Sequence, residues 1–469
     1  MKPVLVWFRQ DLRLADNPAL RHAAATGRPV VCLYVLDDET PGAWRLGGAS
    51  RWWLHQSLQA LKAELEDIGA SLILRRGSAN PVVHSLVDEL GAGAVVWNRC
   101  YEPFAIARDM AVKAKLVQAG IETESFNGSL LFEPWEVKTG GGTPFKVFTP
   151  FWRAARALPG EVKPAARPKA LTPFRGKVAS DRLADWNLLP TRPDWAGGLR
   201  ETWIPGEAGA RQRLSRFLKN LKGYRAARDR PDDRDGTSHL SPHLHFGEIS
   251  PRQVAHAVRS GEHGDDGEKF LSEIGWREFS YHLLFHNPGL PETPLDAKFA
   301  RFPWTGGDAA FKAWTRGRTG YPIVDAGMRE LWHTGFMHNR VRMIAASFLI
   351  KHLGIDWRRG EAWFWDTLVD ADLANNAASW QWVAGCGADA SPFFRIFNPV
   401  LQGEKFDPKG AYVRRWVPEL ATLPDKFIHK PWAAPDAVRP DAKQYPEPIV
   451  DLAEGRARAL AAFKGLSPR

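Results

Sequence analysis

The first 130 residues show short apolar runs that alternate with longer stretches of helical periodicity. Runs rich in β-branched and aromatic residues predict strands over residues 4–8, 30–35, 71–75 and 94–98. Amphipathic spacing predicts helices over 50–67 and 103–119. Strands that alternate with helices are typical of a doubly wound parallel sheet, so we predict an α/β domain over residues 1–130. The absence of a GxGxxG motif argues against an ordinary dinucleotide site there.

The pattern changes after residue 130. Residues 131–205 are rich in Pro and Gly with isolated aromatic residues, which predicts a connector between two domains. From residue 206 the spacing is helical almost throughout, with helix start signals at Ser250-Pro251 and Asp265-Asp266. One more helix is expected after residue 445. We therefore predict a larger all-α domain over residues 206–469.

Length and charge narrow the class of protein. A chain of 469 residues exceeds the roughly 250–300 residues of a single core, so two domains are expected. The formal net charge of +10 favours an anionic partner such as nucleic acid, although a basic surface that serves only solubility explains it equally well.

Cysteine usage and hydropathy indicate the compartment. Cys32, Cys100 and Cys386 are too few and too scattered for a disulfide framework or a metal cluster, so we expect a reducing compartment and no metal centre. The N-terminus does not resemble a signal peptide, and no apolar run approaches the ~18 residues of a membrane span. We expect a cytoplasmic protein without a membrane partner.

The richest chemistry lies between residues 357 and 416. Asp370, Asp372, Asn375 and Asn376 stand directly before a Trp-Gln-Trp sequence, with basic residues around them. Buried amides and carboxylates are costly unless they are bonded, and a hydrophobic core does not need them. The mixture favours a buried redox cofactor next to a polyanion.

A second candidate segment follows Tyr224. Residues 236–242, with the sequence GTSHLSP, place three hydroxyls and several backbone N–H groups ahead of a helix. Such a segment can bind a diphosphate. An ordinary helix-capping loop, with Ser241 or Ser250 as the cap, accounts for the same residues.

Two further clusters combine aromatic and charged residues. Glu273 and Arg277 have the spacing of a helical ion pair beside Trp276, which fits a surface pair or an indole and a carboxylate facing a planar base. Arg340 and Arg342 lie two residues apart on a helix and point to different faces. One can therefore pair with Asp370 while the other reaches a phosphate.

These motifs, taken together, resemble the DNA photolyase and cryptochrome family. The resemblance runs from VWFRQDLRLADNPAL (6–20) through GTSHLSPHLHFGEISP (236–251), GWREF (275–279) and NNAASWQW (375–382) to RIFNPVLQGEKFDPKGAYVRRWVPEL (395–420). It covers nearly the whole chain and is nearest in type to bacterial cyclobutane pyrimidine dimer photolyases of class I or class III.

The resemblance implies an N-terminal antenna domain and a helical domain that binds FAD. The implied FAD-binding residues are Tyr224, Thr237, Ser238, His239, Leu240, Ser241, Arg342, Asp370, Asp372 and Asn376. His239 stands where some relatives carry an arginine. Asn376 would face flavin N5, where a neutral amide can accept a hydrogen bond from the reduced, protonated nitrogen. An amide bonded to its own helix backbone is the plainer alternative for Asn376.

The resemblance also implies an electron path. Trp380, Trp357 and Trp304 align with the tryptophan chain through which electrons reach photoexcited flavin in this family. A row of indoles is equally compatible with core packing.

The same family pattern implies a lesion pocket. Trp276 and Trp382 would flank a cyclobutane pyrimidine dimer, and Glu273, Asn339 and Met343 would meet its pyrimidine edges. Relatives that repair the (6-4) photoproduct carry histidines at positions 339 and 343, and this chain does not. Candidate DNA-backbone contacts are Arg277, Arg340, Arg395, Gln402 and Lys405.

The antenna chromophore is implied less directly. Residues 44–58 and 98–104 resemble folate-binding relatives, which favours methenyltetrahydrofolate over 8-hydroxy-deazaflavin.

The expected activity is light-driven repair of cyclobutane pyrimidine dimers, by electron transfer from excited reduced FAD to a flipped-out dimer. We expect a monomer that acts on DNA without an obligate protein partner. A cryptochrome that binds FAD and signals without repair is the main alternative, and the intact Trp382, Met343 and Glu273 count against it. A structural DNA-binding protein without a cofactor would leave the segment from Asp370 to Trp382 unexplained.

Overall fold

The computed structural model describes residues 1–158, 163–390, 395–439 and 444–466. The chain forms two compact units that interleave along the sequence. The first contains residues 1–219 and 238–288, and the second contains residues 220–237 and 289–469. The domain boundaries near residues 130 and 205 stay predictions.

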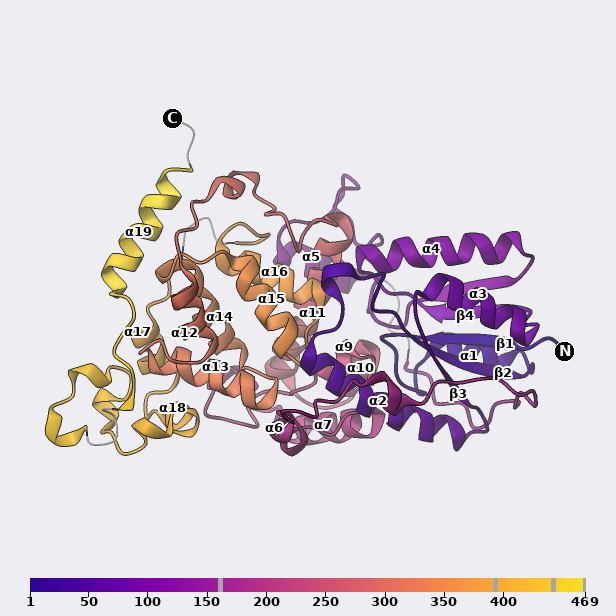
Figure 1. The fold of residues 1–469 in the computed structure, drawn as a ribbon. Coiled ribbons are helices and arrows are strands. Elements are labelled where there is room, and N and C mark those ends of the chain that lie inside the picture. Colours follow the sequence, from indigo (N-terminus) through magenta and orange to yellow (C-terminus); the bar gives the residue numbers. More distant parts are fainter. Residues whose placement is uncertain (159–162, 391–394, 440–443, 467–469) are drawn as a thin grey trace. The chain divides into compact units, whose positions relative to one another are not determined.

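A five-stranded parallel sheet forms the centre of the first unit (Figure 1). Its strand order is β3-β2-β1-β4-β5, with crossovers on both sides of β1. The strands are β1 (Val4–Phe8), β2 (Val30–Leu36), β3 (Leu72–Arg76), β4 (Ala94–Asn98) and β5 (Glu122–Phe126). β1, β2 and β4 are buried along their whole length, which explains their continuous apolar sequence. The predicted doubly wound α/β fold is confirmed.

Four helices connect these strands: α1 (Pro18–Ala25), α2 (Gly48–Glu66), α3 (Ala79–Leu90) and α4 (Pro103–Gln118). The four strands and the two helices predicted from periodicity are present within two residues of their expected ends. β5 was not predicted, because its sequence ETESF is polar and the strand lies at a partly exposed sheet edge.

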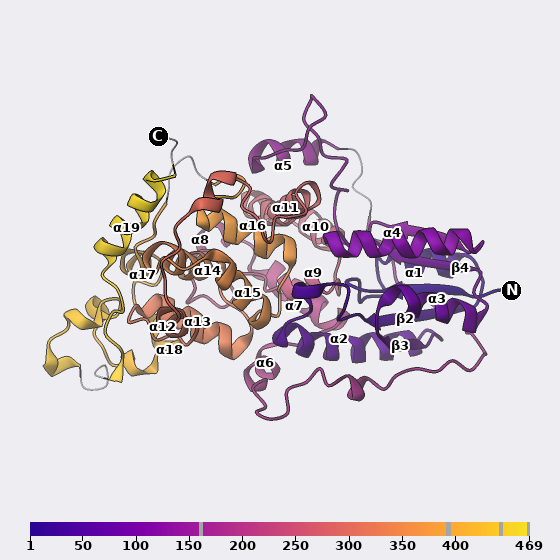
Figure 2. The ribbon, with the colours of Figure 1, turned by 45° about the horizontal axis from the view of Figure 1, so that its top comes forward.

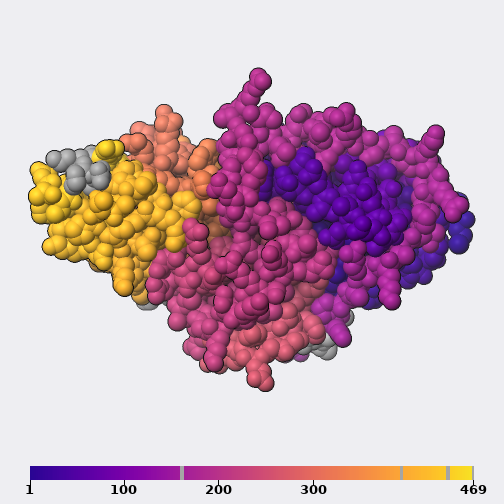
Figure 3. All heavy atoms as spheres, turned by 90° about the horizontal axis from the view of Figure 1, so that it is seen from below, coloured from indigo at the N-terminus to yellow at the C-terminus, as the bar shows by residue number. Residues whose placement is uncertain are grey.

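Residues 131–205 pack within the first unit. They contain α5 (Phe148–Ala157) and α6 (Gly197–Thr202). Between these helices the backbone bonds to the α/β part: Leu171 N donates to Ile68 O at 2.8 Å, and Val30 N donates to Thr172 O at 2.9 Å. Figure 3 shows this Pro-rich stretch, in magenta, lying against the indigo residues of the N-terminal part.

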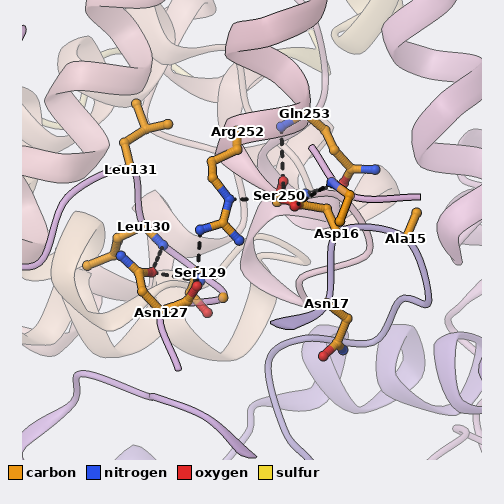
Figure 4. A network of polar contacts seen from close by, with 12 residues as sticks. Ala15, Asp16, Asn17, Asn127, Ser129, Leu130, Leu131, Ser250, Arg252 and Gln253 are labelled. Carbon is orange, nitrogen blue, oxygen red and sulfur yellow. Dashed lines mark hydrogen bonds and ion pairs between the residues drawn. The ribbon is translucent and has the colours of Figure 1, made fainter. Parts of the chain in front are cut away.

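The remaining helices of the first unit are α7 (Glu207–Asn220), α9 (Ser241–His245), α10 (Pro251–Arg259) and α11 (Gly264–His286). Ser250 caps α10 with a complete capping box, as its start signal predicted. Figure 4 shows how α10 is tied to the α/β part: Asp16 accepts from Ser250 Oγ at 2.5 Å and from Arg252 Nε at 3.1 Å. Arg252 Nη1 also donates to Asn127 O at 3.1 Å.

The second unit is helical. Its α-helices are α8 (Tyr224–Ala227), α12 (Asp308–Thr315), α13 (Pro322–Thr334), α14 (Asn339–Ser347), α15 (Trp357–Thr367), α16 (Leu373–Ala384), α17 (Pro399–Phe406), α18 (Ala411–Trp416) and α19 (Leu452–Lys464). A π-helical turn, η4 (Phe348–His352), continues α14. Figure 2 shows α14, α15 and α16 next to one another, and α16 packs against both of the others. No strand occurs in the part of this unit that the structure describes, which confirms the predicted all-α character. Across the described ranges, no helix has the length and apolarity needed to cross a bilayer.

Candidate cofactor and DNA site

The aspartates before α16 serve the helix start as well as the candidate site. Asp372 is the N-cap residue, and its side chain accepts from Asn375 N at 2.8 Å. One turn into α16, the Asn376 Nδ2 group donates to Glu361 O of α15 at 3.1 Å. The amide of Asn376 is therefore held by a neighbouring helix, in place of the bond to its own backbone that was the alternative.

Asp370 pairs with Arg342, as predicted. Arg342 Nη2 lies 3.0 and 2.8 Å from the two carboxylate oxygens of Asp370, and Arg342 Nε donates to Met337 O at 2.7 Å. The Asp370 side chain is only 4% exposed. A buried carboxylate bonded in this way is held in a fixed position.

Glu361 and Thr237 are among the described residues that have buried polar side-chain atoms without a hydrogen-bond partner. Both carboxylate oxygens of Glu361, which is 0% exposed, lack a partner, and so does Thr237 Oγ1. Burial raises the pKa of Glu361 well above its usual value, which favours the neutral carboxyl. Buried polar atoms are bonded in native structures, and these fit a polar cofactor with hydrogen-bonding edges such as FAD.

The three tryptophans of the predicted chain occupy different environments. Trp380 and Trp357 are buried, and Trp304 is half-buried. Among the described residues, no two of the three indoles are in direct ring contact. The ring neighbours of Trp380 are Phe364, at 5.0 Å between centroids, and Trp314, at 6.3 Å.

α14 carries three of the residues predicted to meet the lesion or its backbone. Asn339 is exposed, whereas Arg340 and Met343 are half-buried. The Arg340 guanidinium carbon lies 4.4 Å from the ring centroid of Phe406, and Arg340 Nη2 lies 3.0 Å from Asp229 Oδ1. The pair with Asp229 was not predicted.

Trp382 and α17 contribute the other candidates of the second unit. Trp382 Nε1 donates to Asp389 O at 3.1 Å, which fixes the plane of the indole. Trp382 and Arg395 line a small cavity that also touches Ser347. On α17, Gln402 is half-buried and Lys405 is exposed.

In the first unit, α11 presents Glu273, Trp276 and Arg277. Glu273 forms an ion pair with Lys269 at 3.0 Å. The Trp276 ring stacks on Phe148 with centroids 3.8 Å apart. Arg277 is buried and donates to Ser129 O at 2.9 Å. The guanidinium of Arg277 is therefore engaged inside the unit, and its predicted phosphate contact stays a prediction.

The candidate diphosphate segment, residues 236–242, contains the point in the sequence where the chain passes from the second unit to the first. Tyr224 and Thr237 belong to the second unit, and Ser238 to Ser241 belong to the first. His239 has a φ of +52°, a left-handed conformation that is rare for a residue other than Gly. Leu240 N donates to Ser238 Oγ at 3.3 Å. Ser241 is already helical, and the capping role belongs to Ser250 for α10.

Sequence reasoning missed several residues of this region. Asp229, Glu361, Trp314 and Phe148 touch candidate residues or lie between them, yet none stands out by type. Asp229 offered one weak signal, because it lies in the sequence between Tyr224 and the hydroxyl-rich segment 236–242.

The comparisons with known proteins agree with these features. Residues 4–170 match the family model described as DNA photolyase, and residues 270–465 match the FAD binding domain of DNA photolyase. The chain is 54% identical to a deoxyribodipyrimidine photo-lyase of Agrobacterium fabrum, over 98% of this chain and 97% of that one. It is 42% identical to cryptochrome-1 of Arabidopsis thaliana, over 97% of this chain and 69% of the relative.

A solved structure is similar throughout. A bacterial class III photolyase from Agrobacterium tumefaciens matches with a TM-score of 0.96 and 53% identity, over 99% of this chain and 98% of that chain. An α/β sheet domain followed by a helical domain with an FAD-binding signature defines a class of light-dependent flavoproteins. The chain belongs to the photolyase and cryptochrome family.

Proposed function

We propose that the protein is a deoxyribodipyrimidine photo-lyase of class III that repairs cyclobutane pyrimidine dimers in DNA with light and FAD. The observation that carries this proposal is the 54% identity, over nearly the whole length of both chains, with a photo-lyase. The residue types expected for repair are intact on α14 and α16, including Asn339, Met343, Asn376 and Trp382.

FAD, when bound, supplies the light-driven transfer of one electron, which no amino-acid side chain provides. The chain's own task is to hold the cofactor. We assign this to Arg342, Asp370, Asp372 and Asn376 of the second unit. We propose that a second set of residues binds the phosphates and the sugar chain of FAD: Tyr224, Thr237, Ser238, His239, Leu240 and Ser241. The backbone carbonyl of Glu361 accepts from Asn376 Nδ2 at 3.1 Å, which orients the Asn376 amide.

The second task of the chain is to receive the lesion. A dimer pairs poorly and is extruded from the duplex at low cost. Trp276, backed by Phe148, and Trp382, held by Asp389, are indoles with fixed planes that suit stacking on pyrimidines. Asn339 and Met343 are assigned to the pyrimidine edges. Backbone contacts are assigned to Arg277, Arg340, Arg395, Gln402 and Lys405.

Glu273 is assigned a hydrogen-bond or proton role toward the dimer. Glu273→Ala should lower the repair yield per absorbed photon while the FAD content stays unchanged. Lys269→Ala is the matched control, because it removes the ion-pair partner of Glu273 and leaves the carboxylate in place. An unchanged yield in Glu273→Ala would remove this residue from the mechanism.

Trp380, Trp357 and Trp304 are assigned to photoreduction of the oxidised cofactor. Trp380→Phe should block that photoreduction and leave repair by chemically reduced protein intact. Loss of repair after chemical reduction would show that Trp380 has a second role.

The antenna is proposed to be methenyltetrahydrofolate, with 8-hydroxy-deazaflavin as the alternative, bound by the first unit near residues 44–58 and 98–104. Trp44 is half-buried, while Cys100, Tyr101 and Glu102 are buried. Chromatography of the chromophores released on denaturation separates a folate from a deazaflavin.

We also propose that the protein works as a cytoplasmic monomer without an obligate protein partner. Size-exclusion chromatography with light scattering, in the presence and absence of DNA, tests the oligomeric state.

The deciding experiment uses a duplex oligonucleotide with one thymine dimer, the reduced protein and blue light. A dark control and a duplex with one (6-4) photoproduct are treated in parallel. Light-dependent loss of the dimer alone is the expected result. An FAD-loaded protein that repairs neither lesion would instead be a cryptochrome.

A further inference from the structure

Arg340 has an acidic partner at the point where it is expected to meet DNA. Its Nη2 group lies 3.0 Å from Asp229 Oδ1, and its Nη1 group lies 3.9 Å from Met343 Sδ. The guanidinium also stacks on Phe406. The side chains of Arg340 and Asp229 are 20% and 38% exposed, so water and a ligand can reach the pair.

The neighbouring pair between Arg342 and Asp370 is built differently. Both oxygens of Asp370 are within 3.0 Å of Arg342 Nη2, and Asp370 is almost fully buried. We therefore expect the pair of Arg342 with Asp370 to persist when a ligand binds. The pair between Arg340 and Asp229 has a single contact in a wetter position, which makes it exchangeable.

A DNA phosphate can take the place of Asp229. Phosphate oxygens accept two parallel hydrogen bonds from a guanidinium, whereas Asp229 uses one oxygen. Phe406 keeps the guanidinium plane in position while its partner changes. A phosphate that approaches without making both bonds meets the negative charge of Asp229 and is repelled.

We infer that Asp229 acts as a charge gate on Arg340. In the unbound protein Asp229 pairs with the guanidinium of Arg340, and only a phosphate that makes both hydrogen bonds to this guanidinium displaces Asp229. The inference rests on the proposed repair function, because it takes Arg340, between Asn339 and Met343, as a contact of the lesion's own backbone. An undamaged duplex keeps its bases stacked, so in this proposal its phosphates come near the pair without making both bonds to Arg340. Asp229 therefore increases discrimination by penalising the wrong ligand.

The test is equilibrium binding of the FAD-loaded protein to two duplexes that differ only by one thymine dimer, at several salt concentrations. In Asp229→Asn, affinity for the undamaged duplex should rise about fivefold, because a repelling charge is lost next to the phosphates. Affinity for the damaged duplex should change less than about twofold, since the docked phosphate already outcompetes Asp229. The preference for damage therefore falls.

Asp232→Asn is the matched control. Asp232 belongs to the same segment, pairs with the exposed Arg230 at 2.7 Å, and its replacement changes the net charge by the same amount. Its effect on the two duplexes should be equal, which leaves the preference unchanged. FAD absorbance is recorded for every variant, because Asp229 is near Tyr224 in the chain.

A double-mutant cycle with Arg340→Gln localises the effect. The gain caused by Asp229→Asn should disappear when Arg340 is already replaced, because the two residues act as one pair. Persistence of the gain in the Arg340→Gln background would overturn the gate. Equal weakening of both duplexes by Asp229→Asn would overturn it as well, because Asp229 would then only orient Arg340.

Failure of the proposed function has a different signature. If the unaltered protein does not prefer the damaged duplex, lesion recognition itself is wrong, whatever Asp229 does. If the preference exists and Asp229→Asn leaves it unchanged, only the gate is wrong.

Discussion

Arg13 and Glu361 are both fully buried ionisable residues, one in each unit, and they differ in how many hydrogen-bond partners their side chains have. Arg13 donates to four backbone carbonyls, those of Ala15, Asp16, Gly128 and Gly247, at 2.6–3.0 Å. Glu361 has no partner for either carboxylate oxygen among the described residues.

The difference distinguishes a buried polar group that stabilises the fold from one that we propose lies in the cofactor region. Burial lowers the pKa of Arg13 to about 10, so the guanidinium stays charged at neutral pH and its bonds join loops of the first unit. Burial raises the pKa of Glu361, whose backbone carbonyl accepts from Asn376 of the neighbouring helix. The bonds of Arg13 stabilise the fold by themselves, whereas the unpartnered carboxyl of Glu361 supports the cofactor region proposed above.

The largest effect is expected from Asp370→Asn. Removing this charge leaves Arg342 without its buried partner, which should cost about 3–5 kcal/mol of unfolding free energy and release FAD. Chemical denaturation and flavin absorbance after gel filtration measure both.

The control for Asp370→Asn is Asp308→Asn. Asp308 also pairs with an arginine, Arg359, at 2.7 Å, but it is 93% exposed. Asp308→Asn should lower the free energy of unfolding by less than about 1 kcal/mol and should leave the bound flavin unchanged. Equal effects of the two substitutions would remove the distinction between the sites.

Arg13→Met tests the other side of the comparison. Four carbonyls lose their donor, so the free energy of unfolding should fall by about 2–4 kcal/mol. The folded fraction should still carry its full complement of flavin, since none of the four carbonyls belongs to a residue assigned to the cofactor. Selective loss of flavin without loss of stability would contradict a purely structural role.

Glu361→Gln should show its effect through pH. The folded-state pKa of Glu361 lies above the unfolded value of about 4.3, so its contribution is present at low pH and is lost as pH rises through the folded pKa. The stability of Glu361→Gln relative to the unaltered protein should therefore increase from pH 5 to pH 9, by about 1.4 kcal/mol for each pKa unit of the shift. Urea unfolding across that range measures it, and a pH-independent difference would show that the carboxyl is not buried in neutral form.

Lys351→Met should show a pH dependence of the opposite slope. Lys351 Nζ donates to Ala384 O at the end of α16, and burial lowers its pKa to about 7. The lysine's contribution is lost as pH falls from the unfolded value of about 10.4 to about 7. Over that window the variant should gain stability relative to the unaltered protein, by about 1.4 kcal/mol for each pKa unit of the shift. The lost hydrogen bond adds a loss that does not depend on pH. A slope in the same direction as that of Glu361→Gln would be inconsistent with a buried, neutralised lysine.

The sequence predicted most of the fold because periodicity reports burial. β1, β2 and β4 were recognised by their continuous apolar sequence, and α10 by its Ser-Pro start. β5 was not recognised, since a polar edge strand has no apolar face to reveal it.

The candidate site was predicted where residue type and order suffice, as for the pair of Arg342 with Asp370. Other contacts arise only from tertiary packing. Asp229 pairs with Arg340 across 111 residues, and the stacking of Phe148 on Trp276 joins α5 to α11. Glu361 was overlooked because a glutamate in an amphipathic helix is normally a surface residue, and only the packing shows that it is buried.

The most direct test of the central claim is the flavin content of the purified protein. We expect one FAD per chain that survives gel filtration in the unaltered protein and in Arg13→Met, and that is lost in Asp370→Asn. A colourless unaltered protein, or full retention of FAD by Asp370→Asn, would contradict the claim that the buried pair of Arg342 with Asp370 belongs to the cofactor site.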